Sequence, residues 1–304
     1  MRKFMDKHLV DICIITYQRP LLLKRLLESI FETDQLANDQ TNLIVVDNDQ
    51  ASTAKLIVKE VKDKYSFPIQ YFIEPNKSYT AARNKCIEVS EAQYIAFIDD
   101  DEWVTGPWLK QMLECMEQYS ATAVFGPVLA ALPDTAPQWI KQGRFFEDRE
   151  RPSDGELVKY GHSGNSLINK SLVSDSEFRF KAAFGQAGGE DHELFTRLYE
   201  SGHKLVWADQ AVVYEEVIAE KLNLSWILKR AYRNGDTFAK VYVTNKRWYQ
   251  VFPWYTKKFI HLIVSGLLTP VLFLKGKGHA LRMLSRTVSN YSSIMTLFKP
   301  RKIN

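Results

Sequence analysis

The sequence predicts an α/β protein in which helices cover both faces of a largely parallel sheet. Through the first half of the 304 residues, short apolar runs alternate with segments of helical period. This alternation is typical of a parallel sheet built from successive strand–helix units. The apolar runs are also nearly continuous, as expected for strands that are buried on both faces.

Five apolar runs are predicted to be strands because they are short and rich in Val, Ile, Leu, Phe and Tyr. They are Val10–Thr16, Leu43–Asp47, Ile69–Ile73, Tyr94–Ile98 and Ala123–Leu129. A segment of helical period follows each of the first four. These segments are Pro20–Phe31, 53–64, 79–89 and Pro107–Tyr119. A proline such as Pro20 suits the first turn of a helix, because its φ angle is fixed and its missing N–H is not needed there.

Beyond residue 129 the pattern is less regular. Pro133–Gly155 is rich in proline, glycine and charge, which predicts a loop or lid. Four later segments are predicted as a strand, a helix, a strand and a helix, in that order. They are Lys159–Asn169, Asp191–Ser201, Lys204–Ala208 and Ser225–Val243.

Charge divides the chain into two parts. The formal net charge is +4, but the residues from Lys221 onward hold 16 Lys and Arg against one acid, a charge of +15, which leaves −11 for the first 220. We therefore predict a catalytic domain over residues 1–220 and a basic helical extension over residues 221–304. A basic segment of this kind favours an anionic partner.

The cysteines and the N-terminus predict a cytoplasmic protein. Cys13, Cys86 and Cys115 are widely spaced and match no disulfide or metal pattern, so we expect buried thiols in a reducing compartment. Residues 1–8 are charged and lack the apolar core of a secretory signal.

The basic extension also contains an apolar stretch. Aromatic residues cluster between Trp248 and Phe259, and Phe259–Leu274 carries no formal charge. A membrane-spanning helix needs about 20 apolar residues, and basic pairs on both sides would conflict with the positive-inside tendency. We predict an interfacial or re-entrant segment that holds residues 221–304 on an anionic membrane surface, as a peripheral or monotopic protein on the cytoplasmic face of the plasma membrane. A soluble helical subdomain with a buried hairpin is the alternative.

Four consecutive acids follow the predicted fourth strand, from Asp99 through Asp100 and Asp101 to Glu102. Hard divalent cations prefer oxygen ligands and often bridge carboxylates to phosphates. Ligands bind at the carboxyl ends of strands in open α/β sheets. Alternate residues of an extended segment point the same way, so Asp99 and Asp101 are predicted to face one ligand. We expect Mn²⁺ or Mg²⁺ there; a solvated acidic loop is the alternative.

Three other residues are candidates for the same site. Asp47 ends the second strand, where its carboxylate suits a base or ribose, although an ordinary turn has the same composition. Arg83 lies on a predicted helix beside the nucleotide, or else pairs with a strand-end carboxylate. Asp191 follows two glycines at the start of a predicted helix, as an N-cap or as a general base.

These motifs, in this order, resemble family 2 glycosyltransferases over residues 9–240. They are Ile14–Pro20, Val46–Asn48, Ala82–Asn84, Asp99–Glu102 with Trp108–Leu109, and Gly189–Asp191. The resemblance implies a Rossmann-like fold of the glycosyltransferase A type, inversion at the anomeric carbon and a divalent metal. The segment Asn76–Ser78 departs from the family pattern, because it lacks the usual glycine.

The resemblance also implies roles for single residues. It implies that Asp101, with Asp99, binds the metal, that Asp191 is the catalytic base, and that Glu190 orients the acceptor or donor. Contacts to the nucleotide or donor sugar are implied for Thr16, Tyr17, Arg19, Asp47, Arg83, Asp99, Asp100 and Asn165.

The sequence therefore predicts an inverting glycosyltransferase. The donor is a nucleotide-diphosphate sugar, with UDP favoured by resemblance, and the acceptor is a hydroxyl of a lipid-linked molecule or glycolipid in the synthesis of cell-surface exopolysaccharide or lipopolysaccharide. A membrane-associated, non-catalytic sugar-nucleotide binder is one alternative. A nucleotidyltransferase is another, but it normally has a glycine-rich loop after its first strand, and Tyr17–Pro20 has no glycine. No nucleic-acid partner is expected.

Overall fold

The computed structural model describes residues 9–33, 40–147, 151–174, 176–184, 188–243 and 246–298. The chain divides into two compact units. Unit 1 comprises Met1–Leu129 and Arg149–Glu215, and unit 2 comprises Ala130–Asp148 and Glu216–Asn304. The predicted division at residue 220 differs from this one mainly at Ala130–Asp148, which belongs with the C-terminal helices.

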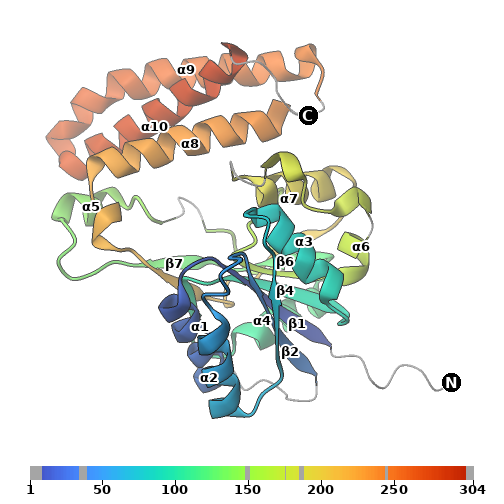
Figure 1. Cartoon of the computed structure of the whole chain (residues 1–304). Coiled ribbons are helices and arrows are strands. Elements are labelled where there is room, and N and C mark those ends of the chain that lie inside the picture. Colours follow the sequence, from blue (N-terminus) through green and yellow to red (C-terminus); the bar gives the residue numbers. More distant parts are fainter. Residues whose placement is uncertain are drawn as a thin grey trace. The chain divides into compact units, whose positions relative to one another are not determined.

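A seven-stranded sheet forms the centre of unit 1, in the order β3-β2-β1-β4-β8-β6-β9 (Figure 1). Its strands are β1 (Val10–Thr16), β2 (Thr41–Asp47), β3 (Ile69–Ile73), β4 (Tyr94–Asp99), β6 (Ala123–Phe125), β8 (Asn165–Asn169) and β9 (Leu205–Trp207). Strand β8 is antiparallel to both β4 and β6, and the other neighbouring pairs are parallel. The prediction of a mostly parallel α/β sheet is confirmed.

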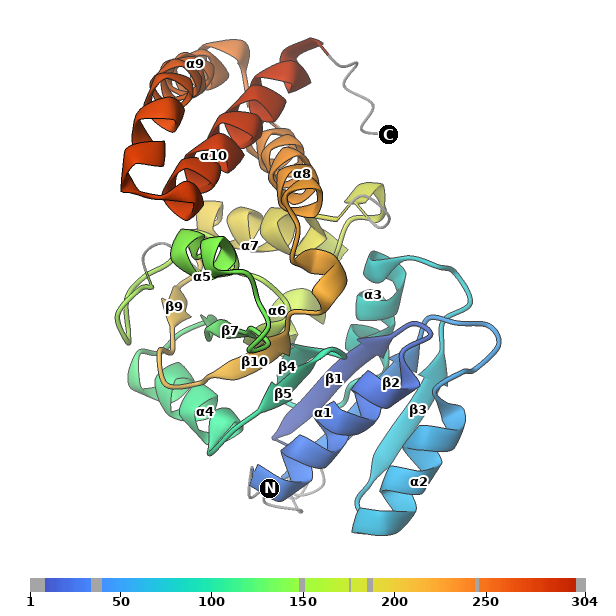
Figure 2. The same cartoon turned by 90° about the vertical axis from the view of Figure 1, so that its left-hand side faces the viewer.

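Helices cover both faces of this sheet (Figure 2). Alternate residues of one strand enter opposite cores: Ile12 and Ile14 pack in one apolar cluster, and Cys13 packs in the other. The first cluster includes buried residues of α1 (Pro20–Thr33), α2 (Lys55–Tyr65) and α4 (Trp108–Gln118). The second includes buried residues of α3 (Tyr79–Val89), α6 (Lys170–Ser174) and α7 (Glu190–Glu200). All three cysteines are free and buried, as predicted.

The predicted strand Ala123–Leu129 is two strands. It breaks at Gly126, where a Cβ atom would lie 2.3 Å from the carbonyl oxygen of Ala211. After the break, β7 (Val128–Ala131) joins a separate three-stranded sheet in the order β5-β10-β7. Its other strands, β5 (Glu102–Val104) and β10 (Val213–Glu216), were not predicted, because such short strands form only through pairing with distant residues.

The segment Pro133–Gly155, predicted as a loop or lid, contains the helix α5 (Gln138–Gly143). Residues 148–150 lie outside the described ranges. The described residues also contain five short 3₁₀ helices that were not predicted. They are Ser176–Phe178, Ala182–Phe184, Ala219–Lys221, Phe273–Lys275 and Thr296–Phe298.

Unit 2 is helical. Its helices are α5, α8 (Leu224–Val243), α9 (Trp248–Leu272) and α10 (Lys277–Met295). Helix α10 packs against the other three. The backbones of α8 and α10 approach closely at Gly235, where a Cβ atom would lie 2.2 Å from the carbonyl oxygen of Ser289. The Ser293 hydroxyl donates to the carbonyl of Gly235 across the same contact, at 2.9 Å.

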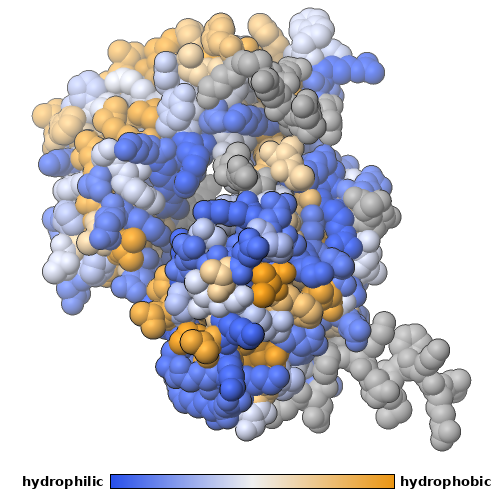
Figure 3. Space-filling model, in the orientation of Figure 1, coloured by the Kyte–Doolittle hydropathy of each residue, from blue (hydrophilic) through white to orange (hydrophobic). Residues whose placement is uncertain are grey.

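Helix α9 has an exposed apolar side (Figure 3). The segment Trp248–Lys275 is long and apolar enough, by length and composition alone, to cross a membrane, and only 6% of its most apolar window is buried. The exposed large apolar residues of α9 itself are Trp248, Tyr249, Phe252, Phe259, Ile260, Ile263, Val264, Leu267, Leu268 and Val271. A helix of a soluble protein normally packs such a row of apolar side chains against the protein core, whereas these side chains of α9 are exposed.

Candidate functional site

The ends of three parallel strands define one edge of the sheet. Thr16 on β1 is in register with Asp47 on β2, and Ile15 is in register with Asp99 on β4. The strand order reverses between β1 and β4, because the chain moves outward through β2 and β3 before it returns to β4. Ligands of open α/β sheets bind at such a switch point, outside the carboxyl ends of the strands.

The acidic run is a turn at this edge and not the extended segment that was predicted. Asp99 ends β4, and Asp100 and Asp101 form the turn. The buried Asp100 carboxylate accepts from the Thr16 hydroxyl at 2.7 Å and from Arg19 Nη1 at 3.1 Å. Arg19 also bonds Asp101 at 3.0 Å. Thr16 and Asp100, both expected to contact the donor, therefore bond each other in this structure.

The buried Arg83 joins the two acidic motifs. Its Nη2 lies 3.3 Å from Asp99 Oδ1, and its Nη1 donates to Glu190 Oε1. The other oxygen of Glu190, Oε2, is buried and has no hydrogen-bond partner in the part of the chain that the structure describes. Burial raises the pKa of Glu190, while the positive charge of Arg83 acts in the opposite direction. Arg83 thus holds carboxylates together, a role that the resemblance did not suggest.

Asp191 lies in the first turn of α7 and is not its N-cap. That position belongs to Gly189, whose φ of 94° is in the left-handed region that favours glycine. The Asp191 side chain accepts from the backbone N–H of His192 at 2.6 Å and faces the backbone N–H of Ser163 at 3.4 Å. Asp191 therefore lies at the N-terminal end of the helix, where the backbone dipole favours negative charge.

The segment Ser163–Gly164 lies between the two acidic motifs. Ser163 contacts Asp191 through its N–H, and a Cβ atom at Gly164 would lie 3.1 Å from Asp99 Oδ2 and 2.7 Å from Glu102 Oε1. Glycine is needed here because the backbone passes against two carboxylates. Asp99 and Asp191, distant in the sequence, are therefore on either side of one short piece of backbone.

Glu102 is a site residue to which the sequence pattern assigned no role. It is 3% exposed, and its Oε2 accepts from the backbone N–H of Asp99 at 3.1 Å. Burial first, and the neighbouring charge of Asp99 second, raise the pKa of Glu102 well above its usual value. Burial also raises the pKa of Asp100, to about 6. The place of Glu102 at the end of the acidic run was the one signal available in the sequence.

Asn165 has a supporting role in this structure. It is fully buried, and its amide oxygen accepts from Trp108 Nε1 at 2.7 Å. Its amide nitrogen donates to the carbonyls of Pro127 and Ala211 at 3.0 and 2.7 Å. Since these bonds occupy both ends of the amide, we revise the expected donor-sugar contact: Asn165 ties the start of β8 to the segments that follow β6 and precede β10.

Asp47 is also fully buried. Its Oδ1 accepts from the N–H of Asp49 at 3.1 Å, and its Oδ2 accepts from the N–H of Ala54 at 2.9 Å and from the Tyr71 hydroxyl at 2.7 Å. The carboxylate holds the loop after β2 in place. In this conformation the protein itself provides the hydrogen bonds that a base or ribose was expected to make.

Tyr17 and Arg19 are more accessible. The ammonium group of Lys77 lies 4.0 Å from the centre of the Tyr17 ring, a cation–π arrangement that links the loop after β1 to the loop after β3. The Arg19 side chain is 51% exposed. Both residues lie in the loop after β1, at the switch point.

The donor groups at the edge fit a hard cation. Acids outnumber bases, since Asp99, Asp100, Asp101 and Glu102 are contacted by three arginines, Arg19, Arg25 and Arg83. The Asp99 and Asp101 side chains remain 41% and 24% exposed. Among the described residues there is no group of three or more His, Cys, Asp or Glu side chains placed to hold a metal by themselves. Mg²⁺ is usually held by one or two carboxylates together with substrate phosphates, so an incomplete protein cage is what such a site requires.

Comparison of the sequence with known proteins gives a family match. The model of glycosyl transferase family 2 matches residues 11–176. The succinoglycan biosynthesis protein ExoM of Rhizobium meliloti is 34% identical over 232 residues, which cover 76% of this chain and 74% of that protein.

Solved structures show the same fold. The mannosyltransferase PcManGT from Pyrobaculum calidifontis, in complex with GDP-Man and Mn²⁺, has a TM-score of 0.65 at 14% identity and covers 94% of this chain and 87% of its own. Residues 1–349 of S. aureus TarS, in complex with UDP-GlcNAc, give a TM-score of 0.56 at 12% identity, with 95% and 91% covered. At these identities the likeness is one of fold.

Proposed function

The chain belongs to glycosyl transferase family 2, and from this membership we propose that it moves a sugar from a nucleoside-diphosphate donor to a hydroxyl of a lipid-linked or glycolipid acceptor. The relative ExoM, a succinoglycan biosynthesis protein, supports a role in the synthesis of a cell-surface polysaccharide. One observation supports the proposed site above all: Arg83 and Ser163–Gly164 bring Asp99 and Asp191 to the same sheet edge.

The proposed reaction is a single displacement with inversion. Asp191 takes the proton of the acceptor hydroxyl, whose oxygen forms a bond to the anomeric carbon while the bond from that carbon to the nucleoside diphosphate breaks. A positioned general base contributes about 10²–10⁴-fold. Arg83 and Glu190 hold the start of α7 against the end of β4, so they set the position of Asp191 relative to the donor.

Asp101 and Asp99 are the residues that would hold Mn²⁺ or Mg²⁺ in this proposal. A bound dication supplies charge stabilisation for a leaving diphosphate. Arg19 Nη1 lies 3.0 Å from Asp101 Oδ2, and its exposed side chain can turn toward a diphosphate.

A donor screen tests this function. We expect one of a panel of nucleotide sugars, with UDP-sugars favoured, to be hydrolysed or transferred in the presence of Mn²⁺, and we expect this turnover to stop in EDTA. Liquid chromatography of the released nucleoside diphosphate measures the rate. Donor binding without turnover on any acceptor would instead identify a non-catalytic sugar-nucleotide binder, and release of inorganic diphosphate from a nucleoside triphosphate would identify a nucleotidyltransferase.

We also propose that unit 2 lies on the cytoplasmic face of the plasma membrane, with the exposed side of α9 in the lipid headgroup zone. Residues 221–304 carry a charge of +15, and each basic residue near an anionic surface contributes about 1 kcal/mol. The aromatic residues at the start of α9 are of the kind enriched at membrane interfaces. A lipid-linked acceptor would then lie at the surface to which the enzyme is bound.

The packing of α10 favours this in-plane placement over a crossing. Tyr255 bonds Thr296, and Thr287 bonds Ser265, so α9 and α10 run antiparallel. A spanning α9 would carry Arg282 and Arg286 of α10 into the hydrocarbon, where an arginine at a helix centre costs at least about 2.5–3.5 kcal/mol. If α9 instead lies in the plane of the membrane, α10 lies on the side of α9 that faces the water.

Replacing Leu267 by glutamate should therefore weaken membrane binding by about tenfold or more, because the change removes buried apolar area and adds a repelled charge. Co-sedimentation with vesicles of anionic phospholipid measures the effect. The matched control is Leu56→Glu on α2, because Leu56 is 79% exposed and Leu267 is 69% exposed. Equal binding by the two variants, or binding that salt does not reduce, would contradict the membrane proposal.

A further inference from the structure

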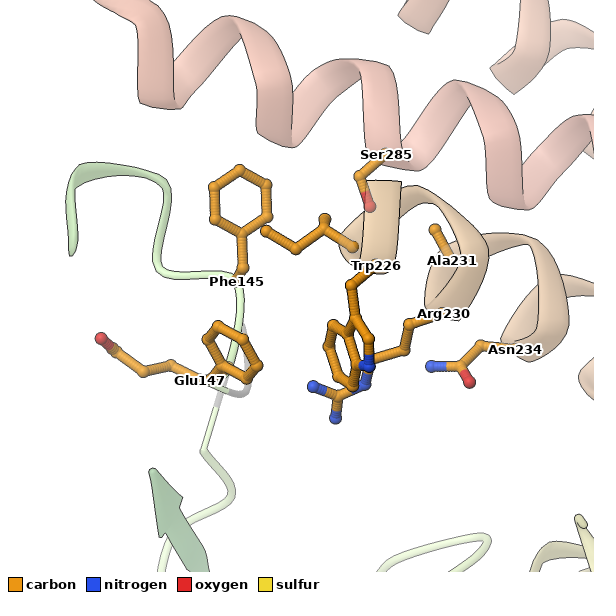
Figure 4. Close-up of a pocket in the computed structure, with 9 residues that line it drawn as sticks. Phe145, Glu147, Trp226, Arg230, Ala231, Asn234 and Ser285 are labelled. Carbon is orange, nitrogen blue, oxygen red and sulfur yellow. The ribbon is translucent and has the colours of Figure 1, made fainter. Parts of the chain in front are cut away.

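Unit 2 contains a cavity whose aromatic side chains pack on one another (Figure 4). Its volume is about 220 Å³, and residues after α5, on α8 and on α10 line it. The rings of Phe146 and Trp226 stack at 5.7 Å between centroids, and the Arg230 guanidinium lies 5.4 Å from the centre of the Trp226 ring. The ring of Tyr160 in unit 1 differs from these, because Tyr160 is 54% exposed and lies against the helix that carries the proposed base.

Tyr160 is linked to Asp191 in two ways. Its ring packs in a T-shaped arrangement against the imidazole of His192, with 4.9 Å between the ring centroids, and the backbone N–H of His192 donates to Asp191. Further along the same segment, the N–H of Ser163 faces the Asp191 carboxylate at 3.4 Å. An exposed aromatic surface and the proposed base are therefore neighbours at the start of α7.

The segment that carries Tyr160 is held on both sides of that residue. Before it, the N–H of Val158 donates to the carbonyl of Leu205 at 3.0 Å, and the Val158 side chain packs against the second apolar cluster. After it, Gly161 lies against the ring of Phe125, where a Cβ atom would be 2.2 Å from a ring carbon. Since these contacts fix the backbone, the fold itself holds Tyr160 beside α7.

The contacts of this segment run in order from the proposed metal ligands to Tyr160. Gly164 lies against Asp99, and Ser163 lies against Asp191. Tyr160 is at the other end of the same segment. In a displacement with inversion, the nucleophile approaches the anomeric carbon from the side opposite to the leaving group. The leaving diphosphate belongs at the Asp99 end, so the acceptor belongs at the Tyr160 end.

We propose that Tyr160 is a specificity-determining residue whose ring packs against the sugar ring that carries the attacking hydroxyl, an inference that rests on the proposed function of the chain. A hydroxyl that reaches Asp191 leaves the atoms attached to it beside Tyr160. A face of a pyranose ring can consist of C–H groups, which pack on an aromatic face while the hydroxyls stay directed at polar groups.

This contact names the class of acceptor. A rigid sugar ring loses less conformational freedom on a fixed aromatic face than a flexible prenyl chain does. The acceptor is therefore a glycolipid that presents a sugar to Asp191, and not a lipid whose own alcohol is the nucleophile.

Saturation-transfer NMR of the full chain, with and without Mn²⁺ and UDP, tests this contact. The probes are the methyl glycosides of glucose, galactose, mannose and N-acetylglucosamine, which have no lipid chain to bind α9. Glucitol is the matched ligand control, because it has hydroxyl groups but no ring. We expect at least one glycoside to bind more tightly than glucitol, and we expect the hydrogens of one ring face to receive more saturation, as stacking requires.

Tyr160→Ala should weaken the affinity for that glycoside about fivefold or more, because it removes the aromatic face. Tyr160→Phe keeps the ring and should retain the affinity within about twofold. The matched control is Tyr199→Ala, which removes a 39% exposed tyrosine from the same helix, about 12 Å along its axis from Asp191. It should change the affinity by less than about twofold. If Tyr160→Ala lowers the melting temperature, Tyr160→Leu replaces it, because leucine keeps apolar volume without an aromatic face.

Three results would overturn the proposal. The parent could bind no glycoside, or bind glucitol as tightly as every glycoside. Tyr160→Ala could lose no more affinity than Tyr199→Ala. Tyr160→Phe could lose as much affinity as Tyr160→Ala, which would assign the contact to the phenol hydroxyl and not to the ring.

Donor hydrolysis by the parent with Mn²⁺, measured without an acceptor, separates this inference from the proposed function. Hydrolysis by a parent that binds no glycoside refutes only the role of Tyr160. Glycoside binding that depends on Tyr160, in a parent that turns over no donor, refutes only the proposed transferase reaction.

Discussion

Replacing Asp191 by asparagine should lower the rate of sugar transfer by about 10²–10⁴-fold. Asparagine keeps the size of the side chain, and its single amide oxygen can still accept from the N–H of His192, so the start of α7 should stay in place. Only the longer contact from the N–H of Ser163 to the other carboxylate oxygen is lost. Asparagine cannot take a proton from the acceptor hydroxyl. Donor affinity, measured by calorimetry with Mn²⁺ present, should not change, because the variant alters the chemical step and not the binding of the nucleotide.

The matched control is Asp63→Asn on α2, which makes the same chemical change at an exposed position away from the sheet edge. It should transfer sugar at the parent rate. If Asp191→Asn also transfers at the parent rate, another group is the base, and the proposed arrangement of the acceptor is wrong.

Replacing Arg83 by methionine should destabilise unit 1 by about 3–5 kcal/mol, because breaking a buried ion pair leaves its partners uncompensated. Arg83 and Glu190 are only 7% and 6% exposed, so water cannot replace the lost contact. Urea denaturation at neutral pH measures the change. The control is Arg19→Met, which removes another arginine that bonds to the acidic run. The Arg19 side chain is 51% exposed, so its loss should cost less than about 1 kcal/mol.

The cost of Arg83→Met should also depend on pH. Burial raises the pKa of Glu190 above its ordinary value of 4.5, so the folded chain holds a proton that the unfolded chain releases, and stability falls as pH rises through this window. Removing Arg83 takes away the charge that opposes this rise, so the pKa of Glu190 in the folded chain moves further up. The pH range over which stability falls then extends to higher pH. The loss should therefore be larger at about pH 8 than at about pH 5.

A second substitution separates a lost ion pair from lost packing. Adding Glu190→Gln to Arg83→Met removes the buried charge that the first change left behind, so it should recover part of the lost stability. Additive destabilisation by the two changes would contradict the view that Arg83 acts by pairing with Glu190.

The strands near the switch point were predictable because their signal is local. Val10–Thr16 and Ile69–Ile73 are strands with the predicted bounds. Val10–Thr16 is a mostly apolar run that is buried on both faces, as in a central parallel strand, and Ile69–Ile73 consists mainly of residues that favour strands. The strands β5 and β10 were missed, because three- or four-residue strands have no pattern of their own and depend on partners elsewhere in the chain. The break at Gly126 was also missed, because its cause is the distant carbonyl of Ala211.

Candidate site residues were identifiable by type and order, but their contacts were not. The acidic run appeared extended, whereas bonds from Thr16 and Arg19 hold Asp100 in a turn. Asn165 was expected at the donor and instead bonds to Trp108 and two carbonyls. Such contacts join residues far apart in the sequence, and no periodicity encodes them.

The sequence by itself determined the class of the fold, the family, the charged and apolar character of the C-terminal helices, and which carboxylates are candidates for chemistry. All of these follow from local composition and motif order. Only the tertiary structure decided that Arg83 ties Asp99 to Glu190 and that residues after α5, on α8 and on α10 line one cavity. The physical reason is that ion pairs and cavities depend on distances in space, which the packing of the helices and the sheet sets.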